Sequence, residues 1–426
     1  MRTLSCLLVI ALLGATPALA VTYVIDPEGT GDFPTIQAAV DAAINGDVIE
    51  LTDGTFAGDG NRDVDYLGKA IIIRSQSGQP EQSTIFCDGS ETDPHRAFNF
   101  VSGEQATSVL SGVTVTGGWV DSPERGAGVR CDNSSSPRIE SCIFTGNRGN
   151  AISCDGSQSL EISDCRFHQN ESRLGGGIYC RSSTMFVDGC DFTENQAEQS
   201  GAGIYGFFAT AEVSDCTFRQ NSGNYGAAVG FNEFCQVSIA DCLFVDNTSI
   251  ACSAVALFLS CTGLIERCTF TGNVATSGST LFSEKISNTT LRNCTFWNNS
   301  SPGGTILAGH QEVWLENCII ADDAVGAAVF SYYDYTELSC CDIHGNAGGD
   351  WVGHIADQYG VNGNICLDPL FCDPGNGDFT LDETSPCAPF SPPNTACDLI
   401  GAEGVGCGAT AVEATTWGQL KAVFHR

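Results

Sequence analysis

Apolar and small residues recur along this chain with a nearly constant step. The segment CIFTGN at 142–147 returns almost unchanged as CTFTGN at 268–273. The same frame, C-x-F-x-x-N, also begins at Cys165, Cys190, Cys216, Cys242 and Cys294. Consecutive cysteines of the frame are 23, 25, 26, 26, 26 and 26 residues apart. A fixed period in this range indicates a solenoid, in which each repeat is one structural unit that stacks on the next.

Each repeat carries two further apolar signals in phase with this frame. An aliphatic residue precedes the cysteine by three positions, and small residues lead into a second aliphatic residue, as in GGGI at 175–178. Cysteine and phenylalanine alternate around one polar or variable residue, which is the period of a half-buried strand. Each repeat therefore predicts two or three short strands joined by turns. The aliphatic residues before the cysteine are Ile139, Ile162, Val187, Val213, Ile239, Ile265, Leu291 and, in an eighth copy that ends at Cys318, Leu315.

These signals predict an all-β fold, a right-handed parallel β-helix solenoid of about ten coils spaced roughly 4.8 Å apart. Stacking would place each cysteine, phenylalanine and aliphatic residue above its counterpart, facing inward. Cysteine behaves in such a position as a small apolar residue, so we expect buried thiols at Cys190, Cys216, Cys242 and Cys268. We expect the asparagine that ends each frame to adopt a left-handed turn and to bond the neighbouring coil through its amide.

An amphipathic segment precedes the repeats. Residues 29–51, GTGDFPTIQAAVDAAINGDVIEL, place Ile36, Val40 and Ala43 on one helical face. The following Asn45-Gly46 is a helix stop signal. We therefore expect an N-terminal capping helix that covers the first coil.

After Phe330 the period fails, and residues 340–407 hold seven cysteines among proline, glycine and aspartate. A solenoid needs a cap over its open core and sheet edges, so we expect a disulfide-rich C-terminal cap in which most cysteines from Cys366 onward are bonded. The predicted divisions are a signal peptide at 1–20, the parallel β-helix at 21–335 with regular coils from about 107, the Cys-rich cap at 336–407, and a linker and short tail at 408–426, where Thr415 or Thr416 can begin a helix.

The first residues have the features of an export signal. Arg2 is followed by the apolar run at 7–13, and Ala18-Leu19-Ala20 is a cleavage site of the A-x-A type. No other stretch has 18 consecutive apolar residues, so we expect no transmembrane segment. The sequence therefore predicts a secreted protein or one held at the cell surface or outer membrane, in an oxidising compartment that permits disulfides.

The charge of the chain limits its partners. Acidic residues outnumber lysine and arginine by 51 to 18, and the formal net charge is −33. A protein so acidic repels nucleic acid, and we expect no nucleic-acid partner. Pectate and alginate are repelled in the same way unless a divalent cation bridges the like charges. From charge alone we expect no activity on these two polymers.

The repeats also carry a family resemblance. Phenylalanine-x-x-asparagine paired with Gly-Gly-Ala-Ile/Leu/Val is similar to the repeat of the chlamydial polymorphic outer-membrane proteins. The whole chain resembles bacterial secreted proteins of the pectin-lyase-like β-helix superfamily, and the likeness extends over roughly 107–330. It implies the fold. It does not imply one function, because pectate lyases, polygalacturonases and pectin methylesterases share that fold, and their local catalytic motifs do not occur in this sequence.

Several segments are candidates for binding or catalysis. Asp59, Asn61, Asp63 and Asp65 alternate along the chain as ligands in calcium loops do, so calcium is the one cofactor that the sequence suggests; the alternative is a solvated turn. Cys340, Cys341, His344 and His354 can be drawn as a zinc set, against which we favour disulfides. Asp93-Pro94-His95-Arg96 is similar to an epimerase motif but has Arg96 in place of its glutamate, and we interpret it as a loop.

Arginine is concentrated in one part of the chain. Seven of its residues lie between 125 and 181, and Arg148 and Arg173 are one coil apart at nearly equal phase. This concentration is a ligand face or, as we favour, a set of charges that balance neighbouring acids. The seven are Arg125, Arg130, Arg138, Arg148, Arg166, Arg173 and Arg181.

Two functions remain open at this point. The favoured one is an exported non-enzymatic β-helix scaffold that adheres to a glycan or a surface protein. The alternative is a polysaccharide-active enzyme, a lyase, hydrolase or epimerase, whose site is assembled across coils. Two or three carboxylates gathered with an arginine or histidine on one coil face would favour the enzyme, whereas a smooth face of asparagine, threonine and serine would favour the scaffold.

Overall fold

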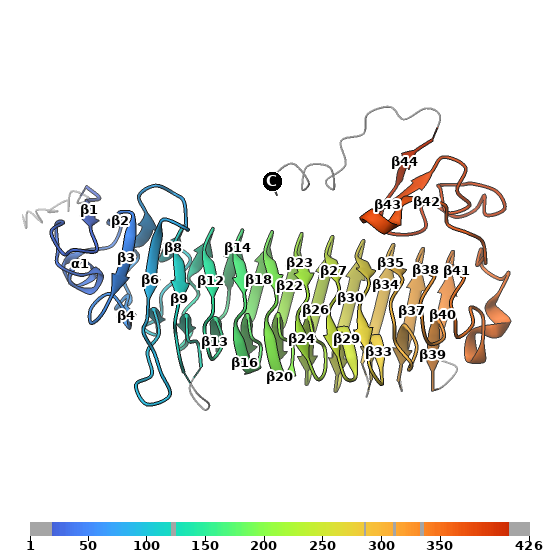
Figure 1. Cartoon of the computed structure of the whole chain (residues 1–426), viewed down its shortest axis with the longest axis horizontal. Coiled ribbons are helices and arrows are strands. Elements are labelled where there is room, and N and C mark those ends of the chain that lie inside the picture. The colour runs from blue at the N-terminus through green and yellow to red at the C-terminus, as the bar shows by residue number, and fades with distance from the viewer. Residues whose placement is uncertain (1–18, 121–124, 285–286, 310–311, 333–335, 409–426) are drawn as a thin grey trace, which may run out of the picture.

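The chain folds as a column of stacked coils, and each coil apart from those at the two ends adds one short strand to each of three long parallel sheets (Figure 1). The computed structural model describes residues 19–120, 125–284, 287–309, 312–332 and 336–408. The predicted signal peptide up to residue 18, and the tail with Thr415 and Thr416, lie outside the described residues. The predicted all-β parallel solenoid is confirmed.

Sheet 1 is the longest and contains 13 parallel strands. Its length exceeds the ten coils that the sequence predicted, because the first coils have aliphatic residues such as Ile49 and Ile73 but no C-x-F frame. In order, its strands are β1 (Thr22–Ile25), β2 (Val48–Leu51), β5 (Ile72–Ser75), β8 (Val109–Ser111), β11 (Arg138–Glu140), β14 (Leu160–Ser163), β18 (Thr184–Asp188), β22 (Thr210–Ser214), β26 (Gln236–Ala240), β30 (Thr262–Glu266), β34 (Asn288–Arg292), β37 (Val313–Glu316) and β40 (Thr336–Ser339).

Sheet 2 has 12 strands and carries the C-x-F frame. Each phenylalanine of the frame is the central residue of its strand. The strands are β3 (Gly54–Ala57), β6 (Ser83–Phe86), β9 (Thr114–Thr116), β12 (Ile143–Thr145), β15 (Arg166–His168), β19 (Asp191–Thr193), β23 (Thr217–Arg219), β27 (Leu243–Val245), β31 (Thr269–Thr271), β35 (Thr295–Trp297), β38 (Ile319–Ala321) and β41 (Asp342–His344).

Sheet 3 has 11 strands, formed by the aliphatic residues that follow each glycine-rich corner. A fourth, shorter sheet of five strands lies between sheets 2 and 3 in the coil order. Sheet 3 contains β4 (Val64–Asp65), β7 (Phe98–Phe100), β10 (Val129–Cys131), β13 (Ile152–Asp155), β17 (Ile178–Arg181), β21 (Ile204–Phe207), β25 (Val229–Asn232), β29 (Cys252–Phe258), β33 (Ser279–Ser283), β36 (Ile306–Ala308) and β39 (Val329–Ser331). Sheet 4 contains β16 (Glu171–Leu174), β20 (Gln196–Ser200), β24 (Ser222–Gly223), β28 (Thr248–Ser249) and β32 (Val274–Ala275).

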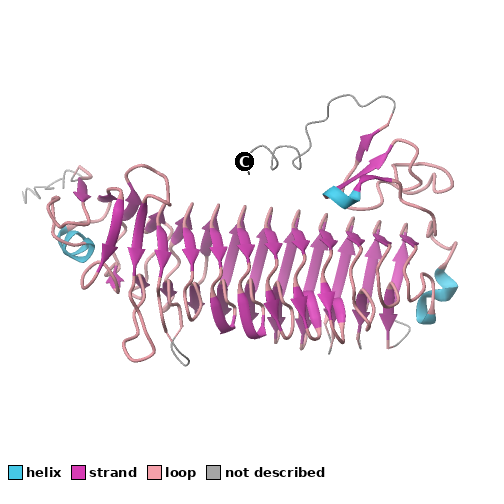
Figure 2. Ribbon diagram, in the orientation of Figure 1, coloured by secondary structure: helices cyan, strands magenta, loops and turns pink. Residues whose placement is uncertain are grey.

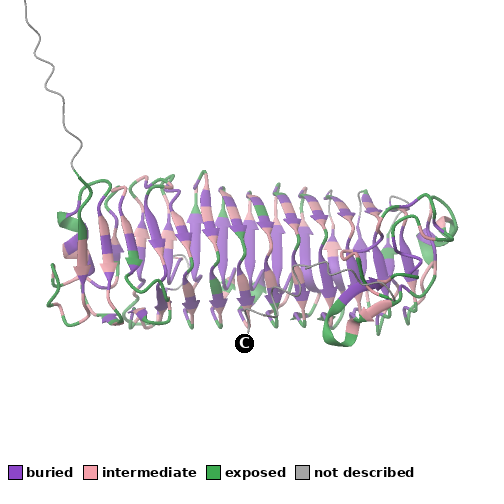
Figure 3. Cartoon of the chain, turned by 90° about the horizontal axis from the view of Figure 1, so that it is seen from above, coloured by how far each residue is buried: buried purple, intermediate pink, exposed green. Residues whose placement is uncertain are grey.

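The core runs the length of the column, as the buried positions along the strands in Figure 3 show. Seven phenylalanines stack in it, and each is fully buried: Phe144, Phe167, Phe192, Phe218, Phe244, Phe270 and Phe296. The ring centroids of Phe218 and Phe244 are 4.9 Å apart, and those of Phe244 and Phe270 are 4.6 Å apart. The predicted inward phenylalanine stack is confirmed.

Nine cysteines form a second internal column beside the phenylalanines. All nine are buried and none forms a disulfide, which confirms the buried thiols predicted at Cys190, Cys216, Cys242 and Cys268. The nine are Cys142, Cys165, Cys190, Cys216, Cys242, Cys268, Cys294, Cys318 and Cys341. Burial raises the pKa of the Cys190, Cys216 and Cys268 thiols well above the ordinary value. These thiols are therefore neutral and unreactive in the folded chain.

The asparagines that end each frame form a third column, with one difference from the prediction. The Asn221 side chain donates to the Asn247 Oδ1 atom at 3.0 Å and to the Phe192 carbonyl at 2.8 Å, so the predicted bonds between coils are present. The left-handed residue is instead the one before, as at Gln220 with a φ of 54°. The predicted conformation was wrong because a buried amide with three partners is held on the inner side of the corner, while the preceding exposed residue makes the turn.

Helices occur only near the two ends of the described chain (Figure 2). The helix α1 (Ile36–Ala42) begins at Thr35, whose side chain accepts from the Ala38 N–H, and buries Ile36 and Val40 against the first coil, as predicted. The short helices η1 (Gly353–Gln358) and η2 (Pro374–Asn376) belong to the C-terminal part. None of the helices in the described residues has the length and apolar character that crossing a membrane requires.

The C-terminal part closes the column in two pieces. Around η1, Ile355 is buried in the main core and Trp351 packs against it, so this segment covers the open end. The chain then folds back along the side of sheet 2, where the small sheet of β42 (Phe371–Asp373), β43 (Asp378–Asp382) and β44 (Val405–Cys407) lies near β35 (Figure 1). Trp297 of β35 contacts Phe379 with ring centroids 5.7 Å apart.

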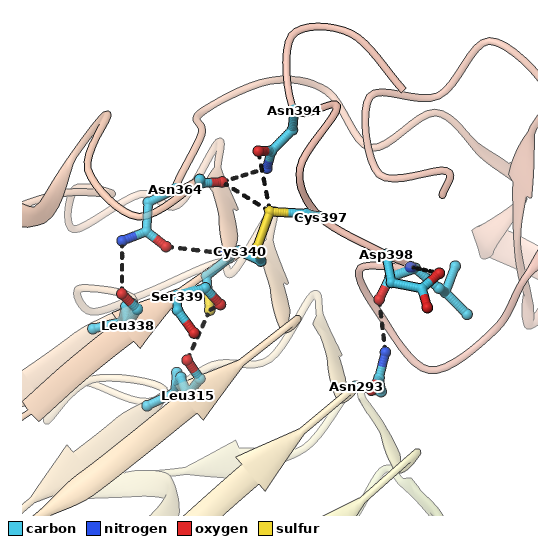
Figure 4. Close-up of a disulfide and its surroundings, with 12 residues drawn as sticks. Asn293, Leu315, Leu338, Ser339, Cys340, Asn364, Asn394, Cys397 and Asp398 are labelled. Atoms are coloured by element: carbon cyan, nitrogen blue, oxygen red, sulfur yellow. Dashed lines mark hydrogen bonds between the residues drawn. A yellow bond between two sulfur atoms is a disulfide. The ribbon is translucent and has the colours of Figure 1, made fainter. Parts of the chain in front are cut away.

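Two disulfides hold the segment that folds back. Cys340 is bonded to Cys397, and Cys372 is bonded to Cys407. Figure 4 shows the first of them beside Asn364 and Asn394. Most cysteines from Cys366 onward are thus bonded, as predicted, although Cys366 and Cys387 are free thiols. Because Cys340 is bonded and Cys341 lies in the internal cysteine column, the zinc set drawn from the sequence does not form.

Candidate functional site

The four residues predicted as calcium ligands have separate partners. Asp59 Oδ1 is 3.3 Å from Arg62, and Asn61 is buried, where its Oδ1 accepts from the Ile36 N–H at 3.0 Å. Asp63 bonds His95 Nδ1 at 2.6 Å and Asp65 accepts from the Leu67 N–H at 2.8 Å. In the described part of the chain no group of three or more His, Cys, Asp or Glu residues is placed to hold a metal ion. The calcium site stays a prediction.

The arginine concentration divides into two groups. Five of the seven arginines form ion pairs with acids, for example Arg138 with Glu140 at 3.0 Å and Arg181 with Asp155 at 3.8 Å. The other pairs are Arg130 with Asp132, Arg148 with Glu171 and Arg166 with Glu81. The favoured interpretation of balanced charges is thus confirmed for these five. Among the described residues, Arg125 and Arg173 have no carboxylate partner within ion-pair distance.

A pocket of about 530 Å³ brings three of these arginines together with three glutamates. We call it the acid–arginine pocket and define it by Glu91, Trp119, Arg125, Arg148, Glu171, Arg173 and Glu198. It lies where the coils at 119, 148 and 171 meet the corner between sheets 4 and 3. Glutamates and arginines that line one pocket favour the enzyme alternative over the smooth polar face.

Backbone pairing positions the first wall of the pocket. Trp119 pairs with Arg148, and Arg148 with Glu171, as parallel bridges that continue the line of sheet 4. The Arg148 guanidinium lies over the Trp119 ring, 4.4 Å from its centroid, and is 3.5 Å from Glu171. Trp119 in turn pairs with His95, so the Asp93-Pro94-His95-Arg96 segment is a loop that supports this wall.

The second wall is built around Arg125. Its guanidinium lies 3.5 Å from the centroid of the Tyr179 ring, which stacks on Tyr205 at 5.8 Å. Burial lowers the pKa of Arg125, and the neighbouring Arg181 charge lowers it further. Arg125 stays protonated at neutral pH, because a guanidinium loses its proton only in strong base.

Two residues of the pocket carry polar atoms without a partner among the described residues. Arg125 Nη1 and Trp119 Nε1 are buried donors, and neither has a hydrogen-bond acceptor in that part of the chain. A buried donor left without an acceptor costs about 1–3 kcal/mol. Arg173, by contrast, is exposed. Its Nε and Nη2 atoms donate to the Gln199 side-chain oxygen at 3.2 and 3.0 Å when the Gln199 amide is oriented with its oxygen toward the guanidinium.

The pocket opens into a groove that follows the coils. Two shallower pockets of about 430 and 290 Å³ share Glu171, Gln196 and Ser222 with each other. Glu171, Gln196, Ser222 and Thr248 occupy equivalent positions on neighbouring strands of sheet 4. We call Gln196, Ser222 and Thr248 the polar track. From Trp119 to Thr248 the row crosses five coil steps, or about 25 Å.

The sequence pointed to only part of this site. The near-equal phase of Arg148 and Arg173 was the usable signal, and sheet 4 does place Arg148 beside the strand that bears Arg173. Glu91 and Trp119 were missed because they lie before the first C-x-F-x-x-N frame at Cys142, so no frame aligns them with Glu171.

Comparison with known proteins finds similar solved structures and one matching family model. Among solved structures, a rhamnogalacturonan lyase matches with 13% identity over 76% of this chain and 87% of its own, at a TM-score of 0.44. The pectate lyase Pel9A matches with 13% identity over 91% and 97% at 0.40, and the PL6 family alginate lyase AlyGC with 13% identity over 92% and 59% at 0.45. A comparison with curated protein sequences gives no match. The family described as right handed beta helix region matches residues 100–262 and 251–365, and the chain belongs to this right-handed β-helix family.

Proposed function

We propose that this protein is an exported glycan-processing enzyme that binds an extended glycan along the groove and cleaves it at the acid–arginine pocket. The observation that carries the proposal is the convergence of three glutamates and three arginines in one pocket at the end of a groove. Elsewhere in the arginine concentration, acids and arginines form isolated surface pairs. Solenoids present such extended surfaces to long ligands.

The pocket has the groups that hydrolysis of a glycosidic bond needs. Such hydrolysis uses one carboxylic acid to protonate the leaving oxygen and one carboxylate on the other side of the bond. Glu171, whose carboxylate lies 3.5 Å from the Arg148 guanidinium, is the candidate for the carboxylate role. Glu91 and Glu198 are then the candidates for the acid.

The groove accounts for the length of the ligand. Gln196, Ser222 and Thr248 offer hydrogen-bonding side chains at each coil step, so successive sugar units meet similar groups. A small ligand would fill the pocket without needing this row. The polar track also favours a second candidate function, in which the protein holds a glycan without cleaving it.

Export belongs to the same proposal. The signal peptide predicted at 1–20 supports export, with the protein either secreted or at the cell surface. The similarity of its repeats to those of chlamydial polymorphic outer-membrane proteins agrees with a surface location.

The test is a screen of the purified protein on soluble polysaccharides. Reducing ends report hydrolysis, the absorbance of unsaturated uronides reports elimination, and glycan-array binding is measured in parallel. For any glycan that is cleaved, Glu171→Gln should lower turnover by about 100-fold or more, because it removes a carboxylate without removing the side chain. Glu140→Gln, which breaks the equivalent surface pair with Arg138, is the matched control and should leave turnover unchanged.

The outcomes separate the two functions. Turnover that depends on Glu171 supports the enzyme. Binding along the groove with no product from any glycan leaves the non-enzymatic scaffold, and the absence of both binding and turnover rejects the groove as a glycan site.

A further inference from the structure

We infer that the glycan of this groove is anionic and that Arg125 and Trp119 hold one of its oxyanions in the acid–arginine pocket. The chemistry recognised is a carboxylate or a sulfate ester on a sugar. The inference deepens the proposed glycan function and rests on it. It also differs from what the net charge of −33 predicted.

The first support is the pair of donors without acceptors. Arg125 Nη1 and Trp119 Nε1 are both buried, both belong to residues that line the same pocket, and neither finds an acceptor among the described residues. Buried donors are almost always satisfied in folded proteins. Two unsatisfied donors in one pocket call for a ligand rich in acceptor oxygens, and an oxyanion offers acceptors to both at once.

The second support is the charge around these donors. Arg125 and Arg173 have no carboxylate partner among the described residues, whereas Arg181 is paired with Asp155. Arg125 is held on the Tyr179 ring, and among the described residues no acid lies within ion-pair distance of its guanidinium. An anionic group would offset the mutual repulsion of Arg125, Arg173 and Arg181.

The third support concerns the range of the opposing charge. At physiological ionic strength, charges beyond about 8 Å are largely screened, so an exposed acid on a distant coil has little effect in the pocket. Within the pocket itself, three arginines face three glutamates, and Glu171 is already paired with Arg148. The local balance thus differs from that of the whole chain, which has 51 acids and 18 bases.

The experiment uses ligands that differ only in charge. Binding of the full-length mature protein is measured to dextran and dextran sulfate, and to polygalacturonate and its fully methyl-esterified form. Each pair shares one backbone, so a preference within a pair reports the anionic group. The two pairs distinguish sulfate from carboxylate. For the preferred anionic ligand, affinity should fall as the salt concentration is raised.

Variants then place the anion. Arg125→Gln should weaken binding of the preferred anionic ligand by about 10-fold to 100-fold, the range of a charge-assisted hydrogen bond. Trp119→Phe keeps the ring under Arg148 but removes the N–H, and should weaken binding by roughly 5-fold. Arg219→Gln on β23 of sheet 2 changes the net charge equally and should leave binding unchanged.

Each outcome decides a separate point. A preference for the charged member of a pair that Arg125→Gln removes, in a variant with unchanged melting temperature, supports the inference. Equal binding of charged and neutral members, or an affinity for the anionic ligand that neither Arg125→Gln nor Trp119→Phe alters, overturns the inference and leaves the proposed glycan function standing. No binding of any glycan overturns both.

Discussion

The middle of the solenoid and its C-terminal part use cysteine in opposite ways. Between 160 and 299 the cysteines stack as buried thiols, while the segment from 340 to 407 contains both disulfides. In the middle, each coil places the same side chain over the same side chain, so packing is shared equally with two neighbours. Beyond β41 the C-terminal segment has no such repetition, and it buries a small cluster around Leu381 and Ile400. Disulfides therefore stabilise this segment, in which identical side chains do not stack.

This difference in repetition also explains why adjacent cysteines of the column do not form disulfides. Cys216 has an equivalent cysteine on either side, and its Sγ instead contacts the Ser214 carbonyl at 3.0 Å. Pairing the column two by two would draw alternate coils together and break their even spacing. Cys372 and Cys407 have one possible partner each within the small sheet, so no competing pairing exists there.

The largest expected effect comes from disrupting the phenylalanine stack in the middle of the solenoid. Phe244→Ala should lower the free energy of unfolding by about 3–5 kcal/mol, because the two neighbouring rings at 4.9 and 4.6 Å would line an unfilled cavity. Phe234→Ala is the control, since Phe234 is 66% exposed and should change stability by about 0.5 kcal/mol or less. Reversible chemical denaturation measures both. A loss below about 1 kcal/mol for Phe244→Ala would contradict the packing account.

The next effect breaks the cross-links. Replacing Cys372 and Cys407 together by serine should destabilise the C-terminal segment by about 2–4 kcal/mol, as expected for opening a loop of 35 residues. Hydrogen exchange should increase in residues 366–407 and stay unchanged in 160–299, because the core of the column does not depend on this bond.

Alkylation without reduction, followed by mass spectrometry, checks the same contrast chemically. Cys216 and Cys242 should be modified as free thiols only after unfolding. A peptide in which Cys216 is linked to Cys242 would show that repetition does not protect the column from oxidation.

The contrast also shows how far the sequence determined the structure. The period of the C-x-F-x-x-N frame predicted the sheets, the inward phenylalanines and the thiols, because identical residues at identical phase must meet when coils stack. The first coils were undercounted because aliphatic residues alone have no distinctive frame. The two disulfide pairs could not be predicted, since the connectivity of several cysteines in an irregular segment is not encoded in their spacing.

The candidate site was less predictable for the same reason. Arg148, Glu171 and Arg173 lie in the periodic part, and their proximity follows from their phase. Trp119 is positioned by an antiparallel backbone bridge with His95, and no repeat in the sequence predicts this bridge. The net charge predicted repulsion of polyanions because it averages over the whole surface, while the pocket depends on which arginines lack an acidic neighbour.

The smallest expected effect lies at the border between the two regions. Asp323 occupies the next place in the asparagine column, accepting from the Asn299 N–H at 2.7 Å and from the Thr305 hydroxyl. Burial, and to a smaller extent the nearby Asp322 charge, raise the pKa of Asp323 from 3.8 to about 6, although hydrogen bonds from Thr305 and Asn299 lower it. Between these two pH values the folded chain binds a proton that the unfolded chain does not, so stability falls as pH rises from about 4 to 6.

Asp323→Asn should therefore raise the free energy of unfolding at pH 7 by about 1–2 kcal/mol and flatten the dependence between pH 4 and 6. Some dependence should remain, because burial also raises the pKa of Asp342 to about 6. The reciprocal change, Asn273→Asp in the regular column, should destabilise at pH 7 and introduce the same fall with rising pH. Denaturation curves at pH 4, 5, 6 and 7 test both variants. If Asp323→Asn lowers stability at pH 7, the hydrogen bond from Thr305 to the Asp323 carboxylate stabilises the fold by more than burial of the carboxylate destabilises it. The coil that contains Asp323 would then differ in kind from the asparagine column that it continues.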